Sequence, residues 1–73
     1  MPDVIAVLDP FAVIREGEDI LRNQLLALSR DHLANISKAY RLNVRVPRNP
    51  DIGELEEAVD LMVRVVSRRA KAA

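Results

Sequence analysis

Three neighbouring side chains are of the types that carry out hydrolytic chemistry. Ser29, Asp31 and His32 lie on one predicted turn, and a serine, a histidine and a carboxylate are the members of a nucleophilic triad. A triad depends on the geometry and role of each member, which adjacency in the chain does not supply. At the start of a helix the same residues act as a capping serine, a first-turn acid at the helix dipole and a solvent-facing histidine. We therefore predict no catalytic residue here.

The chain also lacks the residue sets of other known sites. It has no Cys and one His, and its carboxylates are not arranged around that His, so we predict no metal site. Gly17 and Gly53 are too far apart to form a phosphate-binding glycine-rich loop. Glu54, Glu56 and Glu57 fit a solvated helix face with acids near the positive end of the dipole. We expect a protein that is not an enzyme, with no cofactor and no small-molecule substrate.

The cationic side chains are better candidates, because they are grouped. Eleven Lys and Arg balance eleven Asp and Glu, and this net charge of zero argues against a whole-surface polyanion binder. Residues 37–50, however, contain Lys38, Arg41, Arg45 and Arg48 and no acid. Such side chains can converge on phosphates, and arginine in an extended loop suits a narrow DNA minor groove. We predict these four as nucleic-acid-binding residues.

The length of the chain limits what can position these cations. With 73 residues, 49% of them apolar, it forms one domain over 1–73. A chain this short buries only about 60% of the surface that it exposes when unfolded. No disulfide is available, so its stability must come from helix packing or from a partner chain.

Helical spacing of apolar residues predicts two helices before the cationic segment. Asp9 followed by Pro10 is a typical helix start, and we predict a first helix over 10–28 that Gly17 can kink or split. Ser29 is the next cap, and a second helix over 29–42 ends where Asn43 can take the left-handed conformation. The predicted core residues of the two helices are Phe11, Ile14, Leu21, Leu25, Leu28, Leu33, Ile36 and Tyr40.

A stiff connector and a third helix complete the pattern. Two prolines and the alternation Val-Arg-Val in 44–50 exclude a helix and predict an extended basic connector over 44–49. The third helix, over 50–70, begins after a cap at Asn49 or in a capping box that starts at Asp51. Its predicted core residues are Leu55, Val59, Met62 and Val66, with Ile52 on the same stripe.

The apolar surface of the third helix is wider than a small bundle needs. Leu61, Val63 and Val65 lie off its main stripe, so we predict a second contact there, either with residues 4–8 or with another chain. A short domain with surplus apolar surface is suited to self-association or to a protein partner. These three residues are the candidate protein interface.

The fold class that follows is all-α, a small three-helix domain with a helix, an extended connector and a helix. The N-terminal segment 1–9 contains an apolar run at 4–8 that fits a strand or a helix equally well. The N-terminus has no basic region typical of a signal peptide, and no stretch approaches the ~20 apolar residues of a membrane helix. By elimination, the expected location is the cytoplasm, with no membrane partner.

Residues 28–63 resemble helix-extended-helix modules. The resemblance lies in Leu33, Ile36, Tyr40 and Leu42 before the connector, and in Leu55, Val59 and Met62 after it. Similar patterns occur in SAP domains, in the N-terminal domain of the terminator Rho and in the DNA-binding half of Lsr2-type nucleoid proteins. Residues 45–48 look like the arginine-bearing loop that the last group places in the DNA minor groove.

This resemblance leaves the ligand open. LEM domains and the subunit-binding domains of dehydrogenase complexes share the layout and bind proteins. The glycine that is usual near the end of the first helix of the motif is replaced here by Arg41 or Asn43. The resemblance therefore implies a small binding module whose partner is DNA or, as the alternative, a protein or a second copy of the chain.

Overall fold

The computed structural model describes residues 7–72, and all regular secondary structure within that range is helical. This confirms the all-α prediction, while most of the open choice for residues 4–8 lies outside the described residues. None of the described helices is long and apolar enough to cross a membrane. The elements are α1 (Pro10–Val13), the 3-10 turn η1 (Ile14–Glu16), α2 (Glu18–Leu26), α3 (Arg30–Ala39) and α4 (Ile52–Ala72).

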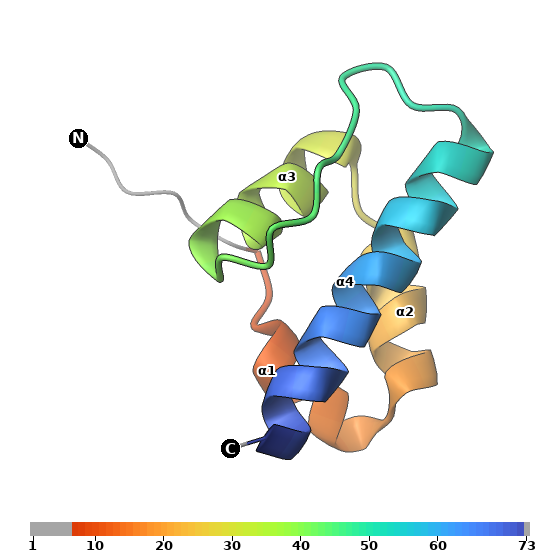
Figure 1. Ribbon diagram of the computed structural model, residues 1–73. Coiled ribbons are helices and arrows are strands. Elements are labelled where there is room, and N and C mark those ends of the chain that lie inside the picture. The colour runs from red at the N-terminus through yellow and green to blue at the C-terminus, as the bar shows by residue number, and fades with distance from the viewer. Residues whose placement is uncertain (1–6, 73) are drawn as a thin grey trace.

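Helix α4 is the longest element, and the other helices pack around it. α1, η1, α2 and α3 all contact it. Figure 1 shows α2 behind α4 and α3 to one side, with the connector arching from the end of α3 to the start of α4. The connector thus joins two helices that both belong to the core.

The predicted helix over 10–28 is not continuous. The Asp9 carboxylate caps α1 by accepting from the N–H groups of Phe11 (2.9 Å) and Ala12 (3.4 Å), as its position before Pro10 predicts. The chain then tightens into η1, and Gly17 adopts a φ of 133°, a region that favours glycine. α2 begins at the next residue, so the described chain has four α-helices where three were predicted.

The later helix starts follow the capping rules. The Ser29 hydroxyl accepts from the His32 N–H (3.3 Å), so Ser29 caps α3 as predicted. Asp31 lies in the first turn, as expected, where it also pairs with Arg30 (2.9 Å), and His32 is exposed. α4 starts with a capping box: the Asp51 N–H donates to Glu54 Oε1 (3.1 Å), and the Glu54 N–H donates to Asp51 Oδ1 (2.7 Å). Of the two predicted starts of this helix, the one at Asp51 is therefore confirmed, and the one at Asn49 is wrong.

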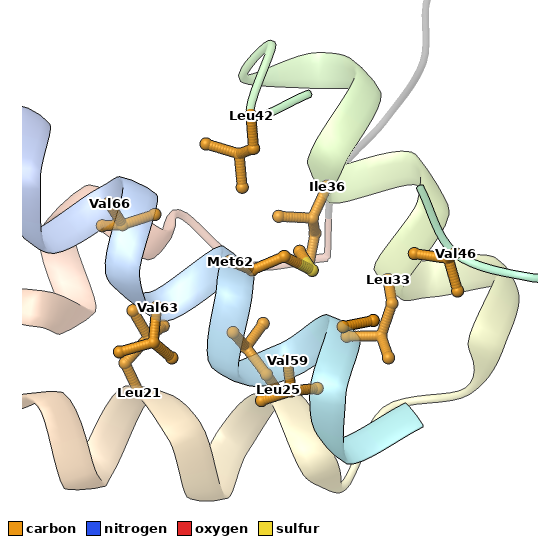
Figure 2. Close-up of a cluster of buried hydrophobic side chains, with 11 residues drawn as sticks. Leu21, Leu25, Leu33, Ile36, Leu42, Val46, Val59, Met62, Val63 and Val66 are labelled. Carbon is orange, nitrogen blue, oxygen red and sulfur yellow. The ribbon is translucent and has the colours of Figure 1, made fainter. Parts of the chain in front are cut away.

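The core lies between α4 and the helices on either side of it. In Figure 2, Leu21 and Leu25 of α2 point toward Val63 and Val59 of α4, while Met62 points toward α3. All twelve residues predicted for the core are buried or packed against it in part. Those that are only partly buried are Phe11, Ile14, Leu28, Tyr40 and Leu55. The buried members of the hydrophobic core outside the prediction are Leu42, Val46, Ala58 and Val63.

Candidate nucleic-acid interface

The end of α3 is closed by a left-handed residue that is not glycine. The Arg41 N–H donates to the Lys38 carbonyl (3.3 Å), and the Leu42 N–H donates to the Ser37 carbonyl (2.9 Å). These are the two bonds of a Schellman motif, in which the residue after the C-cap is usually glycine. Arg41 occupies that position with a φ of 52°, and Asn43 then turns the chain with a φ of 62°.

The connector is attached to α3 through one buried hydroxyl. Ser37, 7% exposed, donates from Oγ to the Val44 carbonyl (2.8 Å) and accepts from the Val44 N–H (3.2 Å). Both backbone groups of Val44 are therefore satisfied by a single side chain. Leu42 and Val46 are buried in the core, while Arg45 between them is exposed. This alternation is that of an extended chain, and it directs Arg45 toward solvent.

Two arginines bind the connector and the turn that precedes it by their guanidinium groups. Arg30 donates from Nε to the Pro47 carbonyl (2.7 Å) and from Nη2 to the Val46 carbonyl (3.0 Å). Arg69 of α4 donates to the Tyr40 carbonyl (2.8 Å) and to the Arg41 carbonyl. The sequence did not predict either contact, because a bond to a distant backbone carbonyl leaves no periodic signal.

Three of the four predicted cations meet on one surface. Lys38, Arg41 and Arg45 line a concavity between α3 and the connector, which we call the connector pocket; its other lining residues are Ala34, Ser37, Asn43, Val44 and Val46. Arg48 is exposed at a bend further along and does not line it. Within residues 7–72, none of these four cations forms a salt bridge.

The C-terminal carbonyls of α3 lie next to this pocket and would by themselves repel an anion. Several of them are, however, engaged: those of Ser37 and Lys38 accept the two capping bonds, and those of Tyr40 and the following Arg41 accept from Arg69. The capping and the positive charge of Arg69 offset the negative end of the helix dipole. The pocket can therefore present its cations to phosphate oxygens.

The predicted protein interface is only partly at the surface. Leu61 is 41% exposed and Val65 is half-buried, but Val63 is 7% exposed and packs in the core. The prediction for Val63 is therefore corrected, because α2 covers that side of α4. Nearby, Arg22 of α2 donates to Asp60 (2.6 Å), and this bond and the charge of Asp60 raise the pKa of Arg22.

Comparison with protein-family models, with curated proteins and with solved structures finds no match to this chain. The function is therefore inferred from the arrangement of its own residues.

Proposed function

We propose that this chain is a small non-catalytic binding module of the helix-extended-helix type that binds duplex DNA through the connector pocket. The observation that carries the proposal is the convergence of Lys38, Arg41 and Arg45 on an anchored surface. Each has a charge that no described acid neutralises by a salt bridge. A group of cations at short spacing on an anchored backbone is suited to successive backbone phosphates.

The backbone at Arg41 supports a role for its side chain. A left-handed conformation costs a residue other than glycine roughly 1–2 kcal/mol. Arg41 adopts this conformation, and its exposed side chain forms no hydrogen bond to another described residue. Strain of this kind at a surface position is typical of functional sites. Phosphate binding by the guanidinium would explain why an arginine occupies a position whose left-handed backbone favours glycine.

Duplex DNA is a better fit than a single strand. Single-strand binders stack bases on exposed aromatic rings. The two aromatic residues, Phe11 and Tyr40, are both partly buried, and their rings pack on each other with centroids 5.8 Å apart. They are therefore engaged in the fold, and the recognition that we propose is of the phosphate backbone.

The experiment is a fluorescence anisotropy titration of a labelled random duplex at low salt. We expect Lys38→Ala with Arg45→Ala to weaken binding by at least about tenfold, because two phosphate contacts are lost. The matched control is Arg64→Ala with Arg68→Ala, which removes the same charge from exposed positions that line a different groove, between α2 and α4. Equal weakening by both pairs would show that net charge, and not the connector pocket, determines binding.

The second candidate function is protein binding or homodimerisation through α4. It is favoured by the exposure of Leu61, 41%, with Val65 half-buried beside it on the helix. If this face is an interface, Leu61→Asp will reduce the mass measured by sedimentation equilibrium to that of one chain. An unchanged mass would exclude self-association through Leu61. The location in the cytoplasm stays a prediction from the sequence.

A further inference from the structure

An apolar groove lies at the opposite end of the connector, where the end of α2, the start of α3 and the first turns of α4 meet. Its volume is about 250 Å³. Leu26, Leu28 and Leu55 line it and are only partly buried, and Ile52 forms part of its wall. Glu56 is its one charged lining residue. The groove is separate from the connector pocket and shares no lining residue with it.

Ile52 is the most exposed large apolar side chain of the described residues, at 76%. The fold does not require an isoleucine at this position, because the start of α4 is already capped by Asp51 and Glu54. An exposed apolar side chain that borders an apolar groove is typical of an interaction surface.

The size of the groove indicates the kind of occupant. Small-molecule clefts usually have volumes of roughly 300–1,000 Å³ and a few convergent polar groups. This groove is smaller and almost wholly apolar, so it suits a few apolar side chains of a protein segment. An amphipathic helix that lays one face into a groove supplies such side chains at spacings of three and four residues.

The charged residues of the segments that form the groove indicate which kind of protein partner it would attract. Residues 49–63 contain five acids and no Lys or Arg, and one of these acids, Glu56, lines the groove. Residues 23–29, the end of α2 and the turn into α3, carry no charge. Two cations flank residues 23–29: Arg30 is bonded to Asp31 and to two connector carbonyls, and Arg22 is paired with Asp60. A second copy would bring the same acids against each other, whereas a basic partner would be attracted.

We infer that this groove docks an amphipathic helix of a partner protein whose apolar side chains are flanked by Lys or Arg. The inference stands independently of DNA binding, because it uses a different surface. Ile52, Leu26, Leu28 and Leu55 would contact the apolar face of the helix, and Glu56 its basic flank.

The test is an NMR titration of the labelled chain with a synthetic peptide of about 15 residues, long enough to form a helix. The peptide carries leucine at positions three and four apart and lysine on the flanks; a second peptide has glutamate in place of lysine. We expect the lysine peptide to shift the amide signals of Leu26, Leu28 and Leu55, and the glutamate peptide to shift none of them.

Two variants locate the surface. Ile52→Ser is expected to weaken binding of the lysine peptide by at least about tenfold, as for an interface anchor. Ile20→Ser removes another exposed apolar side chain, 39% exposed on α2 and outside the groove, and is expected to leave binding unchanged. Binding of duplex DNA by Ile52→Ser should equal that of the unmodified chain, which keeps this test distinct from that of the connector pocket.

Several results would overturn the inference: no binding of the lysine peptide at millimolar concentration, equal binding of the two peptides, or equal binding by Ile52→Ser and the unmodified chain. Groove signals that move with protein concentration alone would identify a second copy as the occupant and would also overturn it.

Discussion

Replacement of Arg41 by glycine should separate the stability of the fold from its function. The substitution relieves the left-handed backbone, which costs arginine roughly 1–2 kcal/mol. Glycine also gives the unfolded chain more freedom, which costs about 0.5–1 kcal/mol. Arg41 uses only its backbone in the fold, donating to Lys38 and accepting from Arg69, and glycine keeps both bonds. The expected net effect is a stabilisation of about 0.5–1 kcal/mol.

The assay is thermal unfolding followed by circular dichroism, together with DNA binding by anisotropy. In a domain of this size about 1 kcal/mol shifts Tm by roughly 4–8 °C, so Arg41→Gly should raise Tm by about 2–8 °C. The same variant should bind duplex DNA more weakly, because a phosphate contact is lost. Arg41→Ala is the matched control: it loses the same contact but keeps the strain, so it should weaken binding without the rise in Tm.

The site specificity of this effect can be checked at Arg45. Its φ is not positive, so Arg45→Gly should lower the stability by about 0.5–1 kcal/mol, as glycine does in regular backbone. A lower Tm for Arg41→Gly would refute the strain at Arg41. An unchanged DNA affinity in Arg41→Gly and Arg41→Ala would refute the role of its side chain.

Three further substitutions test the contacts that build the fold, each by urea unfolding. Ser37→Ala should cost about 1–3 kcal/mol, because it leaves both backbone groups of Val44 unsatisfied; a smaller loss would mean that the connector is not held by this hydroxyl. Asp51→Ala should cost about 0.5–2 kcal/mol by opening the capping box, and no change would place the start of α4 elsewhere. Leu25→Ala should cost about 2–5 kcal/mol at a fully buried position, and a surface-like loss below about 0.5 kcal/mol would contradict the packing of α2 on α4.

The helices were the most predictable part of the fold, because periodicity and capping are local. Asp9 and Ser29 begin helices as their types predict, and the choice between Asn49 and Asp51 was settled by a capping box already visible in the sequence. The break at Gly17 was less certain, since a single glycine in a helical pattern either stays in the helix or adopts a positive φ.

The sequence correctly predicted that the apolar stripe on α4 is wide, but it did not predict why the stripe is wide. Val63 lies off the main stripe and suggested a surface contact, yet it faces Leu21 of α2 in the core. α4 packs against α2 on one side and α3 on another, so it needs a wider apolar surface than a helix with one neighbour.

The anchors of the connector could not be predicted from the sequence. Extended geometry follows locally from Pro47 and Pro50, but Arg69 reaches carbonyls at residues 40 and 41, far away in the chain. Any long cation can donate to a carbonyl, so nothing in the sequence distinguishes the arginines that hold the connector from those that line the pocket. Arg48 lies outside the connector pocket for a similar reason. The path of the connector in three dimensions decides which cations reach the pocket, and the sequence does not reveal that path.

The binding of phosphates by the connector pocket is tested most directly by the salt dependence of duplex binding. Contacts from Lys38, Arg41 and Arg45 predict a slope of about −2.7 in a plot of log K against log salt concentration, at about 0.9 for each phosphate neutralised. Alanine at any one of the three should make the slope shallower by about 0.9. A slope near zero, or one that all three substitutions leave unchanged, would contradict the proposed interface.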